Sequence, residues 1–142
     1  MATYSSTDFL TNAPVAVHGE RKGVQMARAT VACAAAPATI DTLNFFFLPP
    51  SARVVGGYLS STDMDTNGAP TITLNIGDAA AGARLFSAAN VAQAGTTSTG
   101  FAAGALDYQY AAKTLITGTA QANAATGVAG SVTLTLLYVV EE

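Results

Sequence analysis

The sequence of 142 residues is poor in charge and in the side chains that most often carry chemistry. Charged residues make up 11% of it, against about 25% in an average soluble domain. There is no tryptophan, and the single cysteine, Cys33, excludes an internal disulfide. The single histidine, His18, has no second histidine or cysteine at ligand spacing, so we expect neither a zinc site nor histidine-based catalysis. No nucleotide-binding loop or nucleophile motif is present, and no cofactor is expected.

Positive charge is also scarce, which restricts the possible partners. The net charge is −3, and apart from the adjacent Arg21 and Lys22 the six cations are scattered along the chain. Nucleic acid is not expected as a partner, because phosphate binding needs a basic stripe that releases counterions. No run approaches the roughly 18 apolar residues of a membrane span, and the first ten residues lack the basic and apolar regions of a signal peptide. We therefore expect no membrane association and no cleaved leader.

Small side chains dominate what the sequence does contain: 30 alanines, 19 threonines and 13 glycines. The length is that of one domain, which can bury about two thirds of the surface that its unfolded chain exposes. Alanine and glycine contribute little apolar area to a core, and so sparsely charged a surface is weakly solvated. Both shortcomings are relieved if partner subunits cover much of the surface. We therefore expect an oligomer.

The clearest strand signals lie between residues 48 and 78. Residues 54–61 alternate between two faces, and after a polar loop Ile72, Leu74 and Ile76 alternate strictly with polar residues. The loop contains Asn67-Gly68, a dipeptide that tolerates positive φ and is typical of hairpin turns. The pattern predicts a β-hairpin whose strands are joined by this loop.

Other strand signals flank this predicted hairpin. Apolar and polar residues alternate loosely over residues 24–33, and over shorter stretches at 106–111 and 113–121. The pattern of residues 79–95 is typical of a loop or a short helical turn. Residues 40–48 carry apolar side chains on both predicted faces, which favours a strand buried on both sides. In two of these segments the apolar residues that share one predicted face can be listed. They are Leu43, Phe45 and Phe47 in residues 40–48, and Val132, Leu134, Leu136, Tyr138 and Val140 in residues 131–140.

This count of strands predicts the fold class. Seven or eight short strands with no alternation of strands and helices indicate an all-β protein, a two-sheet β-sandwich of jelly-roll or immunoglobulin-like type. We assign residues 25–142 to this sandwich domain. Residues 1–24 have no helical period and read as an extended N-terminal arm, whose spaced apolar side chains would anchor it to another surface. The candidate capsid- or subunit-contact anchors are Tyr4, Phe9, Leu10, Val15 and Val17.

A calcium-loop motif begins within the polar loop but is not completed. Asp63, Asp65, Asn67 and Gly68 reproduce the first half of a D-x-D-x-N-G calcium loop. The position that should carry a bidentate glutamate is Leu74, which belongs to the next predicted strand. A polar loop is therefore favoured over a calcium site, and no metal is expected.

Two further patterns have a structural and a functional interpretation. Asp41, Asp78 and Asp107 might converge as a carboxylate pair for glycoside hydrolysis, but turn chemistry alone places acids near strand ends. Tyrosines could form a sugar-stacking face, but without tryptophan and with strand alternation they are typical of a core or a subunit interface. The three tyrosines concerned are Tyr58, Tyr108 and Tyr110.

Beyond composition, one order of motifs extends from about residue 40 to residue 142. An L-P-x-x-A-x-V segment is followed by a polar stretch rich in aspartate and threonine, then by T-L-x-I-G-D, then by an alanine-, glycine- and threonine-rich region and a closing strand. The residues that carry it are Leu48, Pro49, Ala52, Val54, Asp63, Asp65, Leu74 to Asp78, and Leu137 to Val139.

This order resembles the capsid decoration, or cement, proteins of tailed bacteriophages. The resemblance implies a non-enzymatic structural virion protein, a homo-oligomer and most often a homotrimer. Such a protein would bind the major capsid protein on the outer surface of an assembled head, stabilise that head, and be made in the host cytoplasm. An alternative is a head-fibre or lectin-like module that uses the same sandwich to bind glycans.

Overall fold

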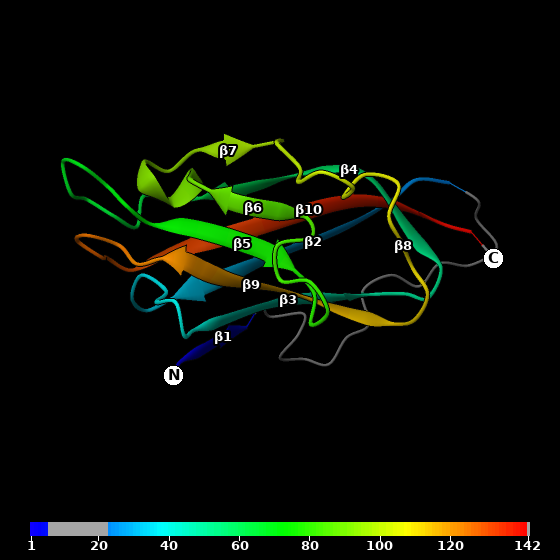
Figure 1. The fold of residues 1–142 in the computed structure, drawn as a ribbon, viewed down its shortest axis with the longest axis horizontal. Coiled ribbons are helices and arrows are strands. Elements are labelled where there is room, and N and C mark those ends of the chain that lie inside the picture. The colour runs from blue at the N-terminus through cyan, green and yellow to red at the C-terminus, as the bar shows by residue number, and fades with distance from the viewer. Residues whose placement is uncertain (6–22, 142) are drawn as a thin grey trace.

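The computed structural model describes residues 1–5 and 23–141 of the chain and shows an all-β protein in which two sheets pack face to face (Figure 1). The described residues contain one short 3-10 helix, η1 (Val91–Gln93), and no helix long and apolar enough to cross a membrane. The all-β sandwich predicted from the sequence is confirmed.

Each sheet is built from strands that are distant in the sequence. Sheet A has the order β1 (Thr3–Ser5), β3 (Thr42–Leu48), β9 (Thr114–Ala122), β5 (Thr73–Gly77) and β6 (Phe86–Ala89). Sheet B has the order β2 (Gln25–Cys33), β10 (Gly130–Val140), β4 (Ala52–Ser61) and β7 (Thr97–Ser98), and β8 (Gln109–Tyr110) also pairs with β4.

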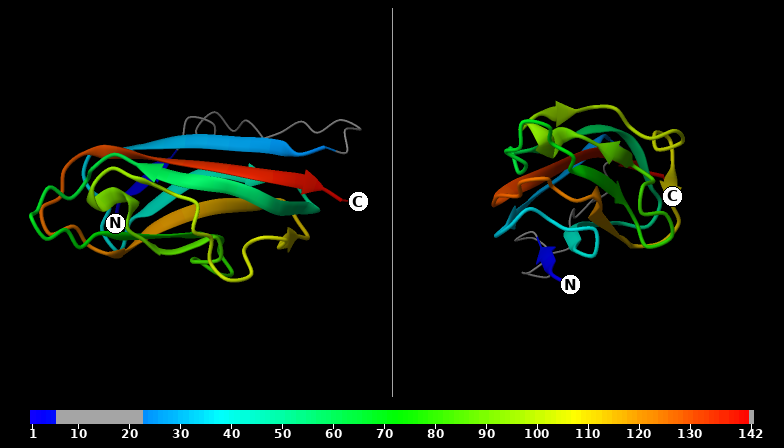
Figure 2. Two further views of the ribbon diagram at one scale, coloured as in Figure 1. Left: turned by 90° about the horizontal axis from the view of Figure 1, so that it is seen from above. Right: turned by 60° about the vertical axis from the view of Figure 1, so that its left-hand side comes forward.

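The order of the strands is that of a jelly roll. From β2 to β5 the chain changes sheet with every strand, and β9 and β10 again lie in different sheets. Because neighbours in sequence lie on opposite sheets, most pairings in each sheet are long-range, as in the double Greek key of a jelly roll. The views in Figure 2 show the two layers wrapped around one core.

The core lies between the inner faces of the two sheets. On β10 the predicted face is confirmed, since four of its five members are completely buried and only Val140 is partly exposed. On β2 small residues face inward, so Ala27, Ala29 and Val31 are buried while Met26 is exposed. The four buried residues of the β10 face are Val132, Leu134, Leu136 and Tyr138.

The predicted hairpin is wrong. β4 lies in sheet B between β10 and the short strands β7 and β8, whereas β5 lies in sheet A between β9 and β6. The polar loop between them therefore crosses from one sheet to the other. Neither Asn67 nor Gly68 has a positive φ; instead, the Asn67 side-chain carbonyl accepts a 2.9 Å hydrogen bond from the amide of Ala69. The loop turns through an Asx turn, not a hairpin turn.

Burial on both sides, predicted for β3, is largely confirmed, but a bulge interrupts the alternation of the strand. The pairing of β3 with β9 skips one residue between Asn44 and Phe46, and Phe45 and Phe46 are both buried. A bulge adds one residue to a strand and so changes which side chains face the core. Phe47 is partly exposed beneath Lys113, whose ammonium lies 4.5 Å from the ring centroid.

Two weaker predictions are confirmed only in part. The strand predicted at 106–111 is reduced to the two residues of β8, and the preceding Asp107 has φ 67°, which an extended strand does not allow. The segment 79–95 contains β6 and the helical turn η1.

The first residues of the predicted arm form an edge strand of sheet A. β1 pairs in parallel with β3, Tyr4 opposite Leu43, and the amide of Ala2 donates a 2.7 Å hydrogen bond to the carboxylate of Asp41. The N- and C-termini lie at opposite ends of the sandwich (Figure 1).

Candidate interaction surfaces

A buried carboxylate organises the loops at one end of the sandwich, which we call the Asp65 tip and define as residues 62–72 and 123–129. Asp65 is 1% exposed, and its carboxylate accepts four backbone hydrogen bonds. Two come from its own loop and two from the β9–β10 loop, so the carboxylate joins segments about sixty residues apart. The donors are Thr71 at 2.7 Å, Ile72 at 3.2 Å, Ala125 at 2.9 Å and Thr126 at 2.8 Å.

This environment decides the charge state of Asp65 and its availability to a metal. Burial on its own would raise the pKa of Asp65, but the four N–H donors hold it well below its ordinary value. Both oxygens are already occupied by protein donors, and Leu74 is buried in β5. Within residues 1–5 and 23–141 no group of three histidine, cysteine or acidic side chains could hold a metal ion. The residues of the calcium-like motif thus form a structural loop.

Two of the three candidate carboxylates for glycoside hydrolysis, Asp41 and Asp78, are not brought together. β3 and β5 both pair antiparallel with β9 and therefore run in the same direction. Asp41 precedes β3 and Asp78 follows β5, so the two lie at opposite ends of sheet A. Asp41 accepts hydrogen bonds from the amides of Ala38 and Ala2, which lower its pKa although burial opposes them. Asp41 thus has a structural role.

Asp78 is also engaged, in a buried ion pair. Its carboxylate accepts a 2.5 Å hydrogen bond from Nε of Arg84 and two more from the amides of Ala80 and Ala81. Burial would raise the pKa of Asp78, but Arg84 and the two amides outweigh it and lower the pKa. A carboxylate paired in this way is not free to act as a general acid, because it stays ionised.

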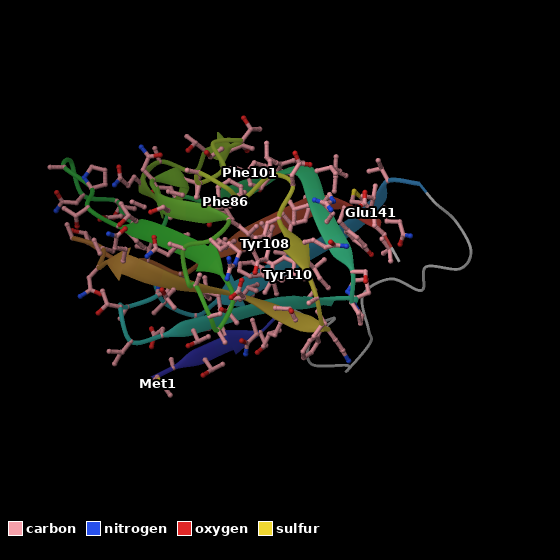
Figure 3. All side chains as sticks on the ribbon, turned by 45° about the vertical axis from the view of Figure 1, so that its right-hand side comes forward. Met1, Phe86, Phe101, Tyr108, Tyr110 and Glu141 are labelled. Atoms are coloured by element: carbon pink, nitrogen blue, oxygen red, sulfur yellow. The ribbon has the colours of Figure 1, made fainter. Side chains whose placement is uncertain are left out.

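Two of the three tyrosines of the candidate sugar-binding face, Tyr108 and Tyr110, are packed into the protein. The guanidinium of Arg84 lies 4.0 Å from the ring centroid of Tyr108, which packs edge-on against Tyr110 with centroids 4.9 Å apart. Tyr110 is 4% exposed, and burial, together with the negative charge of Asp78, raises the pKa of its hydroxyl. Figure 3 shows Tyr108, Tyr110, Phe86 and Phe101 gathered on one side of the sandwich. The two tyrosines thus hold the 99–113 segment against the core, whereas Tyr58, the third candidate, is 36% exposed on β4.

One of the five candidate anchors can be placed in the structure. Tyr4 is partly buried in β1 and packs against the core of its own sandwich. The other four anchors, Phe9, Leu10, Val15 and Val17, lie outside the described residues.

Four of the seven exposed large apolar side chains in the described residues lie together at sheet B, in a place that the sequence did not predict. Val24, Met26, Val55 and Tyr58 lie on or next to the outer face of sheet B, with exposures between 36% and 62%. The alternation of β2 contained the signal, but its loose pattern gave no reason to bury alanines and expose a methionine.

Solved structures that resemble this chain include proteins of phage capsids. No family profile and no curated protein matches the sequence. A chain from the capsid asymmetric unit of cyanophage Pam1 is 38% identical, with a TM-score of 0.78 over 92% of this chain and 96% of that chain. The chain belongs to a family of bacteriophage capsid proteins.

Other solved structures agree. A chain from the capsid of Ralstonia phage GP4 is 29% identical to this capsid protein, with a TM-score of 0.85 over 99% of both chains. A chain from the acid-stable capsid of Helicobacter pylori bacteriophage KHP30 shares the fold, with 17% identity and a TM-score of 0.51 over 83% of this chain and 89% of that chain. This capsid protein is a structural protein of a virion.

Proposed function

We propose that this capsid protein is a decoration protein: a homotrimer that binds the major capsid protein on the outer surface of an assembled phage head and stabilises the head. The observation that carries the proposal is the match to capsid chains over nearly the full length of both partners, which makes the relatives equally small single sandwiches. A single sandwich of this size is consistent with a component that is added to an assembled shell. We further propose that it is made in the host cytoplasm before it joins the virion.

The distribution of charge favours the outer surface over the inner one. The protein carries a net charge of −3, and in the described residues Arg84 and Arg53 are paired with Asp78 and Glu141. A surface that faces packaged DNA needs unpaired cations to neutralise phosphates. Few are available here, so contact with DNA would be repulsive and contact with the outside of the shell would not.

Stabilisation of the head requires no chemistry beyond binding. A protein that binds only the assembled shell shifts assembly towards that state by mass action. A trimer that makes several weak contacts at once gains further, because each contact raises the effective concentration of the next. The buried tip around Asp65 and the packed 99–113 segment make each subunit rigid, which lowers the entropy lost on binding.

We propose that the N-terminal arm, residues 1–24, contributes some of these contacts, while residues 25–142 form the folded domain. Tyr4 packs on the sandwich and fixes the beginning of the arm. The apolar side chains beyond it would then contact the shell or a neighbouring subunit: Phe9, Leu10, Val15 and Val17.

The test uses undecorated heads and purified protein. We expect light scattering to give a mass three times 14.3 kDa, and we expect the protein to co-sediment with the heads and to raise the temperature at which they release DNA. A variant without residues 1–24 should keep its trimeric mass and bind the heads less tightly. A protein that fails to co-sediment with heads, or that binds them without changing their heat stability, would contradict the proposal.

A further inference from the structure

The outer face of sheet B is an ordered array of side chains, because β2, β10 and β4 lie side by side (Figure 2). The strand registers place three rows across it. The rows are Met26–Leu137–Gly56, Arg28–Thr135–Tyr58 and Thr30–Thr133–Ser60. We call these nine residues the β10 face.

The β10 face is apolar at one end and contains no acidic residue. Met26 is 61% exposed, Tyr58 is 36% exposed, and Leu137 is partly exposed beside them. Arg28 is the only charged member, and it forms no ion pair with any residue in the described part of the chain. Exposed apolar area of this kind on a soluble protein marks an interaction site.

The members of the face complement one another across β10, which is the central strand of the three. A large side chain, Met26, occupies one edge of its row, and the other edge is Gly56, which has none. A cation, Arg28, occupies one edge of the next row, and the other edge is the aromatic ring of Tyr58. Within one subunit these partners are two strands, or about 10 Å, apart, so they do not meet.

They do meet in a pair of subunits related by a two-fold axis along β10. Such an axis brings β2 of one copy over β4 of the other, so that Met26 faces the partner's Gly56 and Arg28 faces the partner's Tyr58. A cation over an aromatic ring is attractive. The two Arg28 side chains fall on opposite sides of the axis, about 10 Å or more apart, where salt at physiological strength largely screens their repulsion.

A buried, unpaired hydroxyl lies at the centre of the face. Thr135 lies at the centre of the middle row, is 2% exposed, and its Oγ1 has no hydrogen-bond partner among the described residues. Buried polar atoms in folded proteins nearly always have a partner. The neighbouring row satisfies its own hydroxyls, since Thr30 and Thr133 are hydrogen-bonded at 2.7 Å.

We propose that the β10 face is an isologous contact through which a second copy of this chain docks. The inference deepens the proposed function and rests on it. A three-membered ring is closed by heterologous contacts, so a two-fold contact is additional to the trimer. In an icosahedral shell, two-fold axes relate neighbouring three-fold positions, and the β10 face would therefore join adjacent trimers into a network.

The first test traps the contact with a bismaleimide cross-linker. Leu137→Cys places a thiol on the strand at the axis, and Thr117→Cys places one on the outer face of β9 in sheet A as a matched control. Native Cys33 is 3% exposed, and we expect it not to react in the folded protein. We expect a covalent dimer of twice 14.3 kDa from Leu137→Cys, both in solution and on decorated heads, and little from Thr117→Cys. Equal yields from the two variants would overturn the proposal.

The second test removes the contact. Met26→Lys adds a charge at a site 61% exposed, and Ile40→Lys adds one at a site 63% exposed in the β2–β3 loop. In the Leu137→Cys background, Met26→Lys should abolish the covalent dimer and Ile40→Lys should not. Neither change should prevent a single trimer from binding a head, which separates this inference from the proposed function.

Other occupants of the face would give different results, and each would overturn the inference. If Met26→Lys abolishes co-sedimentation with heads and leaves cross-linking unchanged, the face binds the shell. If it lowers only the melting temperature of the isolated protein, the face is covered by another part of the same chain.

Discussion

Replacement of Gly57 by alanine adds one methyl group. We expect it to destabilise this protein more than any other glycine-to-alanine replacement in sheet B. Gly57 has φ 135°, a conformation that L-residues rarely adopt. It faces Leu136 of β10, and a Cβ built on it would overlap the backbone carbonyl oxygen of Thr135 and lie 2.9 Å from Cα of Leu136. The obstacle is backbone held by strand pairing on both sides, so it cannot rotate away.

The magnitude follows from two contributions. An unfavourable backbone conformation costs about 1–3 kcal/mol, and overpacking costs about 1–3 kcal/mol more. We expect a loss of about 2–6 kcal/mol from a total stability of roughly 5–15 kcal/mol. With an unfolding entropy of about 2.1 cal/mol/K per residue, or about 0.3 kcal/mol/K for the whole chain, the melting temperature should fall by about 7–20 °C.

Gly56→Ala provides a matched control in the neighbouring residue. Gly56 does not have a positive φ, and its Cβ would lie 3.6 Å from Cδ1 of Leu137, an ordinary contact. Its stability should change by less than about 1 kcal/mol, and a gain is expected because alanine restricts the unfolded chain. Unfolding in urea can be followed by circular dichroism or tyrosine fluorescence, since the protein has no tryptophan. Equal stabilities of the two variants would refute the strained conformation assigned to Gly57.

Three further predictions concern buried groups. Asp41, Asp65 and Asp78 have lowered pKa values, so their stabilising effect is complete above pH 4 and is lost as the pH falls further. Asp65→Asn should therefore reduce stability to urea at pH 7 and make the loss of stability between pH 4 and pH 2 less steep. An equally steep loss of stability in the variant would count against this prediction. Burial, and secondarily the charge of Asp41, raises the pKa of Cys33 to about 11, so a thiol reagent at pH 8 should modify it only as fast as the protein unfolds; rapid labelling of native protein would show that it is accessible. Arg84→Gln removes the ion pair with Asp78 and the cation over Tyr108, so trypsin should cleave after Lys113 faster than in the unmodified protein, whereas Arg28→Gln should leave that rate unchanged.

The periodicity of the sequence predicted where individual strands lie better than it predicted which strands pair with one another. β10 could be predicted because its buried side chains alternate without interruption, and nothing in that pattern depends on what the strand pairs with. The link between β4 and β5 could not, since a turn dipeptide such as Asn67-Gly68 reports local backbone preference and not the sheet that the next strand joins. The bulge in β3 depends on its register with β9, which adjacent residues do not encode.

The candidate site was predictable only in part, for the same reason. The incomplete motif at Asp65 favoured a polar loop over a calcium site, yet the role of Asp65 as an acceptor for four amides depends on a loop sixty residues away. Tyr108 and Tyr110 were ambiguous because their exposure is set by Arg84, which lies in a different segment. The β10 face was missed because it arises from the register of three strands and is visible in none of them alone.

The carboxylate of Asp65 also bears on how the chain folds. Its donors Ala125 and Thr126 follow it by 60 and 61 residues, so the tip cannot close until β9 and the turn towards β10 have been added. Structures dominated by pairings of such separation fold slowly, in milliseconds to seconds. β9 and β10 are also interior strands of the two sheets, so neither sheet can be completed before they are made. Closure of the Asp65 tip is therefore a late event in folding. We expect a subunit to become competent to assemble only when the chain is complete, and not when its first half has collapsed.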